Sequence, residues 1–373
     1  MTPYEDLATR DLPALRTRGE MLDILQREVY GYLPTKECTV TADEPKKVEA
    51  RYMRGTVHHT FVNLTLHFNN GDHTFRVDRL LHTDGKRRPL IVYLSFHPLR
   101  ETNYFAIEEM SEREVDFLTF CYTDVTSDDI DFRSGLARIL LPHGQNRSYA
   151  PGKIALWAYA AMRVLDYGLT LPGTDPDAIG IAGHSRLGKT ALFAAAMDTR
   201  FRFALVNNSG CGGDALAHGN TGHGMPEFHY PDAGELYSNM LSAFPYWGCP
   251  GFLRHTERNL SDEFDQHFLV AAVAPRYTFH VAAELDLWAD PVSQYLCTVA
   301  ATPAFRELGL EGMTDCDRFP EPGEVRLSGH IGFYYAPTDH FLGRRNWNYF
   351  IDFIEAHRGD PVEGDVPSAS ITL

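Results

Sequence analysis

Two kinds of hydrophobic pattern divide the chain. Between residues 48 and 82, apolar and polar residues alternate, which is typical of antiparallel strands near the edge of a sheet. Farther along, short and nearly continuous apolar runs predict strands that are buried on both faces. These runs are 90–96, 115–122, 179–182, 203–206, 277–283 and 332–336.

Segments with helical spacing of apolar residues separate most of the predicted buried strands. They are 152–168, 187–198, 292–308 and 344–357, and a further helix is predicted over 19–31, where the pattern ends on a glycine. Strands that alternate with helices favour a mostly parallel sheet covered by helices on both faces. We therefore predict one α/β domain over 1–373, with a helix and antiparallel strands as an N-terminal extension in 1–85.

Composition and charge limit the possible partners. Of the 373 residues, 44% are hydrophobic, which suits a large core. The chain carries a net charge of −16. This charge argues against nucleic acid and anionic membrane surfaces as partners. No run approaches the roughly 18 apolar residues of a membrane span. No signal peptide is visible, so we expect a cytoplasmic protein, or an extracellular one if a leader was removed.

Six scattered cysteines show no metal-ligand spacing. In a protein expected in the cytoplasm, reduced thiols are the default. The sequence therefore predicts neither a metal site nor a cofactor.

The segment 179–194 contains the main candidate for catalytic chemistry. It consists of a short apolar strand, a tight Gly-His-Ser-Arg turn and an Ala-rich helix. Such a turn exposes the serine oxygen and directs the helix N-terminus towards the group that the oxygen attacks. This context favours Ser185 as a nucleophile over a simple helix cap. The common Gly-x-Ser-x-Gly pattern is not kept, because Leu187 takes the second glycine position and Gly188 follows it.

A serine nucleophile needs a base, and the base needs an acid that orients it. In α/β-hydrolases the chain order is serine, acid, histidine. His340 fits the base because it lies between the last predicted strand and the last predicted helix. Asp286 fits the acid, a few residues past the preceding strand, with Glu284 and Asp290 as rivals. Asp290 stands directly before a proline and would also suit the cap of the next helix.

Several motifs occur in an order that resembles a known family. They are Gly-His-Ser-Arg-Leu-Gly-Lys (183–189), Asn-Asn-Ser-Gly-Cys-Gly-Gly (207–213), Phe-Pro-Tyr-Trp (244–247), Asp-Gln-His-Phe-Leu (265–269), Ala-Pro-Arg (274–276) and Ala-Glu-Leu-Asp-Leu-Trp-Ala-Asp-Pro (283–291). Arg-Glu-Val-Tyr-Gly-Tyr-Leu-Pro (27–34) and Asp-His-Phe-Leu (339–342) extend the match towards both ends. Together they resemble the bacterial type of glucuronoyl esterase, carbohydrate esterase family fifteen of the α/β-hydrolase superfamily.

This resemblance implies a serine esterase that cleaves esters of 4-O-methyl-glucuronic acid, the linkage between xylan and lignin alcohols. It implies Ser185 as the nucleophile, His340 as the base and Arg186 as an oxyanion ligand. A guanidinium there would oppose the negative charge that acyl transfer builds on the carbonyl oxygen. The residues that the resemblance assigns to the sugar are Lys189, Glu235 and Trp288. The implied partner is a uronic-acid ester or a xylo-oligosaccharide.

The chain departs from the family pattern at two places. Many relatives carry the acid immediately before the Ser-Gly-x-Gly-Gly segment, where this chain has Asn208. An amide cannot supply the negative charge that stabilises an imidazolium, so Asp286 is the residue that would replace it. The segment 214–233 reads as an inserted loop near the active site. Its three histidines, His218, His223 and His229, lack regular metal-ligand spacing.

Two other functions stay open at the level of sequence. One is a different carbohydrate esterase, such as a deacetylase of xylan oligosaccharides. The other is a catalytically weak sugar-binding protein, in which the loss of the acid at Asn208 is not compensated.

Overall fold

A computed structural model of the chain describes residues 2–52, 55–100, 103–220 and 234–361. Within these residues the strands form an 11-stranded sheet in the order β1-β3-β4-β6-β5-β7-β8-β9-β11-β10, with β2 paired to β3. The strands are β1 (Thr39–Ala42), β2 (Lys46–Tyr52), β3 (Val57–Phe68), β4 (Gly71–His82), β5 (Arg88–Ser95), β6 (Asp116–Cys121), β7 (Thr174–His184), β8 (Phe203–Asn207), β9 (Tyr277–Ala283), β10 (Val325–Arg326) and β11 (Ile331–Ala336).

The centre of the sheet is parallel and its two ends are antiparallel. Strands β6, β5, β7, β8, β9 and β11 run parallel to their neighbours within this series. Antiparallel pairing adds the strands β1, β2, β3 and β4 at one end of the sheet and the strand β10 at the other end. The sequence prediction of buried parallel strands beside an alternating antiparallel edge is thus confirmed. The short strands β1 and β10 were not predicted.

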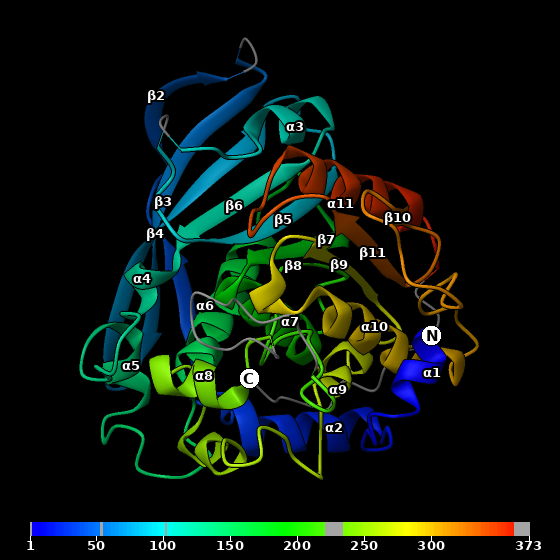
Figure 1. Cartoon of the computed structure of the whole chain (residues 1–373). Helices are drawn as coiled ribbons and strands as arrows, with labels where there is room; N and C mark the ends of the chain where they lie inside the picture. Colours follow the sequence, from blue (N-terminus) through cyan, green and yellow to red (C-terminus); the bar gives the residue numbers. More distant parts are fainter. Residues whose placement is uncertain (1, 53–54, 101–102, 221–233, 362–373) are drawn as a thin grey trace.

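Helices cover both faces of the sheet (Figure 1). One face carries α3 (Ile107–Glu112) and α11 (Arg344–His357), and the other carries α6 (Lys153–Gly168), α7 (Arg186–Met197) and α10 (Pro291–Arg306). The long helices α6, α7, α10 and α11 fall where the apolar spacing predicts helices. The shorter helices are α1 (Pro3–Leu7), α2 (Arg18–Leu25), α4 (Tyr122–Val125), α5 (Gly135–Leu140), α8 (Tyr237–Ala243) and α9 (His267–Ala271).

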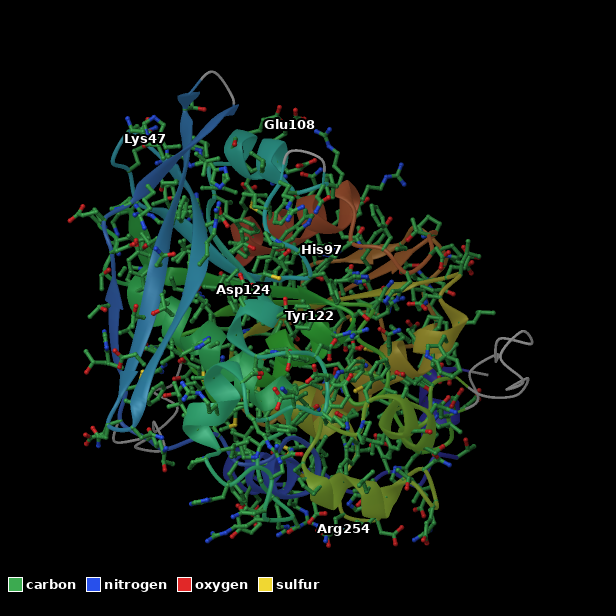
Figure 2. All side chains as sticks on the ribbon, turned by 90° about the vertical axis from the view of Figure 1, so that its left-hand side faces the viewer. Lys47, His97, Glu108, Tyr122, Asp124 and Arg254 are labelled. Atoms are coloured by element: carbon green, nitrogen blue, oxygen red, sulfur yellow. The ribbon has the colours of Figure 1, made fainter. Side chains whose placement is uncertain are left out.

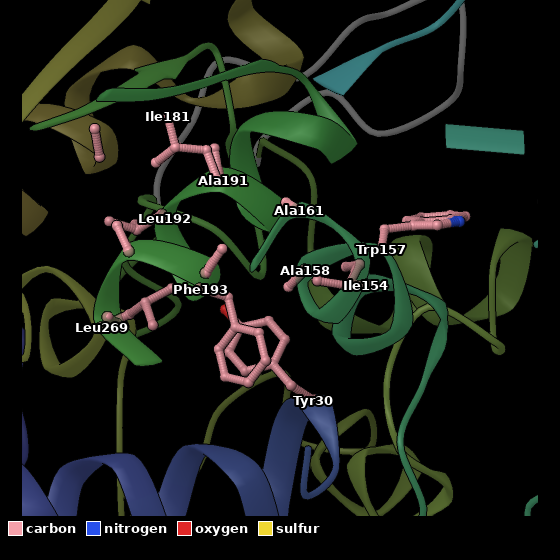
Figure 3. Packing of buried hydrophobic residues seen from close by; sticks show 14 of the residues in the cluster. Tyr30, Ile154, Trp157, Ala158, Ala161, Ile181, Ala191, Leu192, Phe193 and Leu269 are labelled. Atoms are coloured by element: carbon pink, nitrogen blue, oxygen red, sulfur yellow. The ribbon is translucent and has the colours of Figure 1, made fainter. Parts of the chain in front are cut away.

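The N-terminal extension packs directly against the helix that follows the candidate nucleophile. Helix α2 continues into a π-helical turn, Gln26–Tyr30, and the ring of Tyr30 stacks on Phe193 of α7 with 4.3 Å between ring centroids (Figure 3). The Tyr30 hydroxyl donates a hydrogen bond to the carbonyl of Gly212 at 2.8 Å. Full burial of an aromatic side chain contributes roughly 1.5–3 kcal/mol to stability. The extension therefore helps to fix α7 beneath the sheet.

Small side chains let α7 approach its neighbours closely. Alanines at 191 and 194–196 are fully buried, and α6 presents Ala158 and Ala161 in the same cluster (Figure 3). Interiors are packed at crystal-like density, so such small faces fix the separation of two helices. The alanines of the segment Thr-Ala-Leu-Phe-Ala-Ala-Ala (190–196) thus determine how closely α7 packs against α6.

Candidate active site

The candidate residues follow the carboxyl ends of neighbouring parallel strands. Ser185 follows β7, Asn208 follows β8, Asp286 follows β9 and His340 follows β11. Because parallel strands end at the same edge of a sheet, these residues are brought together there. They line one cavity of about 420 Å³, together with Arg186, Lys189, Glu235 and Trp288. Every site residue proposed from the sequence therefore reaches the same cavity.

Ser185 lies on a sharp turn between β7 and α7. Its φ is 57° and its ψ is −128°, a backbone conformation that L residues rarely adopt. A Cβ at Gly183 would lie 1.9 Å from the carbonyl oxygen of Leu187, so the turn requires glycine at 183. A Cβ at Gly188 would lie 3.0 Å from Ser209 Cβ and 3.1 Å from the Asn207 carbonyl. The displaced second glycine thus serves the close contact of α7 with the end of β8.

His340 and Asp286 form the acid–base pair of the cavity. Nδ1 of His340 lies 2.5 Å from Oδ2 of Asp286, which holds the proton on Nδ1 and leaves Nε2 as the basic nitrogen. The Asp286 side chain is 5% exposed and that of His340 is 40% exposed, so the imidazole is open to a ligand. Asp290 instead caps α10, because its side chain accepts the Ser293 N–H at 2.9 Å. Glu284 makes no hydrogen bond to His340 in the described part of the chain.

A second histidine packs against the first. The rings of His184 and His340 lie 4.4 Å apart between centroids. Burial, together with the nearby charge of His340, lowers the pKa of His184 from 6.5 to about 3. Asn207 donates from Nδ2 to Nδ1 of His184 at 2.9 Å, which suits a neutral ring. His184 therefore adds no positive charge beside His340 at neutral pH.

Asp128 holds the Arg186 guanidinium beside the elbow. Nη1 of Arg186 donates a hydrogen bond to Oδ2 of Asp128. The other carboxylate oxygen, Oδ1, accepts the indole N–H of Trp247 at 2.8 Å. Tyr122, which is labelled in Figure 2, donates its hydroxyl to Oδ2 at 2.8 Å. The guanidinium also lies 4.6 Å from the centre of the Trp247 ring, a cation–π distance. Arg186 is thus fixed before any ligand binds.

Sequence reasoning missed Asp128 as a functional residue. Its signal was the acidic stretch Asp-Val-Thr-Ser-Asp-Asp (124–129) directly after the buried strand β6. Phe244 and Trp247, which lie beside Arg186, entered the sequence analysis only as part of a family motif. Their rings stack with 3.9 Å between centroids and an angle of 3° between the ring planes. A pattern that is local in sequence does not reveal that this aromatic pair meets the loop after β6.

Lys189 and Glu235 form a partly buried charged pair in the cavity wall. Lys189 is 3% exposed and donates a hydrogen bond from Nζ to the carbonyl of Ser209. Nζ also lies 3.8 Å from Oε2 of Glu235. Burial raises the pKa of Glu235, and the charge of Lys189 opposes this shift. The Glu235 N–H donates to the Trp288 carbonyl at 2.7 Å, which ties the three proposed sugar contacts together.

A buried network supports the floor of the cavity. Ser209 donates its hydroxyl to Oδ1 of Asp214 at 2.5 Å, and Oδ2 of Asp214 lies 2.9 Å from Nδ1 of His280. The side chains of Asp214 and His280 are fully buried. The network fixes the carbonyl of Ser209, which is the carbonyl that Lys189 contacts.

Of the three histidines in the segment 214–233, the structure describes only His218. Nδ1 of His218 lies 2.8 Å from Oδ2 of Asp265, and the backbone N–H of His218 also donates to this carboxylate. His223 and His229 lie outside the described residues. Among the residues that the structure describes, no group of three His, Cys, Asp or Glu side chains could hold a metal ion. None of the described helices is long and apolar enough to cross a membrane.

Comparison with known proteins identifies the family of the chain. The sequence pattern of the family "Glucuronyl esterase, fungi" matches residues 100–309, more than half of the chain. A carbohydrate esterase, MZ0003, of an unknown prokaryotic organism is 35% identical over 206 residues, which are 55% of this chain and 44% of that protein. The 4-O-methyl-glucuronoyl methylesterase of Schizophyllum commune is 30% identical over 207 residues, 52% of this chain and 51% of that protein. These matches span about half the length of the two relatives.

A solved structure extends the comparison over nearly the whole fold. A promiscuous CE15 esterase from a marine bacterial metagenome superimposes with a TM-score of 0.79 at 25% identity, covering 91% of both chains. The parallel sheet, the serine elbow and the histidine–aspartate pair define the fold as that of an α/β-hydrolase. Within this class, the chain belongs to the glucuronoyl esterase family.

Proposed function

We propose that the protein is a serine carboxylester hydrolase that cleaves esters of glucuronic acid and 4-O-methyl-glucuronic acid. Its substrates would be lignin–carbohydrate or glucuronoxylan fragments. The observation that carries the proposal is the 2.5 Å contact between His340 and Asp286 in the cavity that Ser185 lines. Without an acid on the histidine, the replacement of the family acid by Asn208 would leave a sugar-binding cavity only.

In the first half-reaction, Ser185 Oγ attacks the ester carbonyl carbon while His340 Nε2 takes the hydroxyl proton. Asp286 holds the Nδ1 proton and stabilises the imidazolium that forms. The tetrahedral intermediate then expels the alcohol, which leaves with the proton from His340. The product of this step is an ester between Ser185 and the uronic acid.

The negative charge of the intermediate falls on the former carbonyl oxygen. The N–H groups of Arg186 and Leu187, at the very start of α7, would add donors near this oxygen, because the first N–H groups of a helix lack partners within it. The Arg186 guanidinium, held by Asp128, supplies a positive charge beside them. Removal of one oxyanion donor typically costs about 3–4 kcal/mol of barrier. We assign this role to Arg186.

In the second half-reaction, water takes the place of the alcohol. His340 Nε2 removes a proton from the water as its oxygen attacks the acyl carbon. Collapse of the second tetrahedral intermediate returns the proton to Ser185 and releases the uronic acid. The site thus requires only the ester and water.

Lys189, Glu235 and Trp288 would select the acyl group. A charged pair can bind several sugar hydroxyls, because ammonium donates and carboxylate accepts. The indole of Trp288 adds a flat apolar surface at the same cavity. All three residues would bind the acyl portion of the ester, so the site would not select among leaving alcohols.

The test compares two substrate types. We expect release of benzyl alcohol from benzyl glucuronate to exceed release of acetate from acetylated xylo-oligosaccharides in kcat/KM. Ser185→Ala should lose this activity, while Ser134→Ala, at an exposed serine, should not. Faster release of acetate would make the protein a carbohydrate deacetylase. Binding of the uronate without any turnover would make it a sugar-binding pseudo-enzyme.

A further inference from the structure

The side-chain amide of Asn208 is buried without hydrogen bonds. The residue is 1% exposed, and in the described part of the chain neither Oδ1 nor Nδ2 has a partner. Buried polar atoms in proteins are nearly always satisfied, and leaving them unpaired costs stability. An amide with both atoms unmet therefore points to a partner that is absent when the cavity is empty.

The backbone fixes this amide beside the candidate nucleophile. The Asn207 carbonyl accepts the Ser185 N–H at 2.9 Å, and the Asn208 N–H donates to the Val281 carbonyl at 2.8 Å. Asn208 has a φ of 44°, a conformation that asparagine tolerates better than most residues. Asn208 lines the same cavity as Ser185, Asp286 and His340. Its position is thus set by three adjacent strands, β7, β8 and β9.

The chemistry of the amide limits what can satisfy it. Nδ2 needs an acceptor and Oδ1 needs a donor. The carbonyl, ester and ring oxygens of a pyranuronate ester only accept, so they leave Oδ1 unpaired. A sugar hydroxyl both donates and accepts, and it is therefore the substrate group that can meet Oδ1.

We propose that Asn208 is a specificity-determining residue, whose buried amide hydrogen-bonds a ring hydroxyl of the uronic acid held next to Ser185. The inference rests on the function proposed above, because it names the part of that acyl group which the site recognises. It gives Asn208 a binding role in place of the acid role that this position has in many relatives. The interaction selects for sugar acids over simple acyl groups.

Kinetics on a matched set of substrates tests the proposal. The set is benzyl glucuronate, its 2-deoxy, 3-deoxy and 4-deoxy counterparts, and p-nitrophenyl acetate. For Asn208→Ala we expect a fall of about 10- to 100-fold in kcat/KM on benzyl glucuronate, as for a lost hydrogen bond to a substrate hydroxyl. On the one deoxy ester that lacks the contacted hydroxyl, the kcat/KM of the wild-type protein should already be lower by this factor. Asn208→Ala should lower kcat/KM on that ester by less than a further threefold. Asn208→Leu, which nearly keeps the side-chain volume, should behave alike.

Two kinetic results would overturn the inference. A similar fall on every ester, p-nitrophenyl acetate included, would mean that Asn208 acts through Ser185 or His340. No fall on any ester would mean that the amide does not meet the substrate. Melting temperatures of both variants report whether folding is intact, and Asn208→Ala suffices if the leucine variant does not fold.

A binding experiment separates this inference from the proposed function. Methyl glucuronoside, whose carboxyl group is not esterified, is titrated calorimetrically into Ser185→Ala and into Ser185→Ala/Asn208→Ala. We expect at least about a tenfold weaker Kd for the double variant. Equal affinities would overturn the role of Asn208 even if benzyl glucuronate is a good substrate. A failure of the wild-type protein to cleave any glucuronate ester would instead overturn the proposed function and leave this binding difference measurable.

Discussion

Arg186 and Asp128 lie 58 residues apart in the sequence and pair directly beside the candidate nucleophile. The Arg186 side chain is 24% exposed and that of Asp128 is 11% exposed, so solvent screens the pair only in part. Two cations begin α7, Arg186 and Lys189, and both would oppose the helix dipole if left alone. Asp128 offsets one of them and Glu235 the other, which permits a positive charge to stay at the proposed oxyanion position.

The first prediction concerns this pair. Asp128→Asn should lower kcat on benzyl glucuronate by about 10- to 100-fold, because charged hydrogen bonds of about 1.5–3 kcal/mol no longer hold the guanidinium. KM should change less than kcat, since Asp128 is placed to act through Arg186. Asp129→Asn is the matched control, because Asp129 is an exposed neighbour. Equal effects of the two substitutions in steady-state assays would refute the positioning role.

The second prediction concerns the nucleophile. We expect a fluorophosphonate ester to label the protein once, on Ser185, as detected by mass spectrometry of peptides. Ser185→Ala should lose both the label and nearly all turnover while its melting temperature stays close to that of the wild type. The strained backbone at Ser185 makes the variant informative about chemistry, because alanine adopts the same backbone conformation as serine at similar cost. Labelling that persists in the variant would remove Ser185 from the mechanism.

The third prediction separates the acid candidates. Asp286→Asn should cut kcat by up to about 10⁴-fold, the size seen for this change in a serine protease triad. Glu284→Gln and Asn208→Ala should each cost far less, because neither side chain hydrogen-bonds His340 among the described residues. Asp290→Asn should mainly lower the melting temperature, since it weakens the cap on Ser293 N–H. A severe kinetic loss in Glu284→Gln with a mild one in Asp286→Asn would be incompatible with the proposed triad.

The fourth prediction concerns acyl selectivity. Lys189→Ala should lower kcat/KM on benzyl glucuronate by several-fold to about a hundredfold, as for the loss of charged hydrogen bonds. The fall on p-nitrophenyl acetate should be much smaller, because that substrate has no ring to bind. Lys189 also donates to the Ser209 carbonyl, so a melting curve must accompany the kinetics. An equal fall on both substrates would assign Lys189 to support of the elbow rather than to the sugar.

The fifth prediction is a pH dependence of stability that comes from His184. Its pKa is about 3 in the folded protein against an ordinary value of 6.5. Above pH 6.5 the ring is neutral in both states and contributes no pH dependence. As the pH falls from 6.5 towards 3, the unfolded chain binds a proton that the folded protein does not. The free energy of unfolding therefore decreases, by up to about 1.4 kcal/mol per pH unit.

Urea unfolding at intervals between pH 4 and 7 measures this effect. His184→Gln should show a shallower decline of stability towards acid than the wild type, whereas His58→Gln, at an exposed position on β3, should keep the original slope. The same slope in all three proteins would mean that His184 is protonated in the folded state.

The sequence by itself determined the buried strands, the long helices and the elbow that carries the candidate nucleophile. Buried parallel strands must be apolar on both faces, and amphipathic helices must repeat every 3.6 residues, so both leave a local signal. The elbow at Ser185 is likewise local, because the glycines and the strand–helix transition are adjacent in the chain. Short elements such as β10 and α4 escaped prediction because a few residues carry too little periodicity.

Only the tertiary structure decided which acidic group serves which partner. Glu284, Asp286 and Asp290 stand within seven residues of each other in the sequence, and local signals such as the proline after Asp290 left all three open as the acid. The path of the chain after β9 turns Asp286 towards His340 and commits Asp290 to the cap of α10. Asp128 was beyond sequence reasoning for the same reason, since its meaning depends on Arg186, which β7 brings beside the end of β6 through the intervening strand β5. Hydrogen bonds of this kind depend on the register and packing of distant strands, which a linear pattern does not encode.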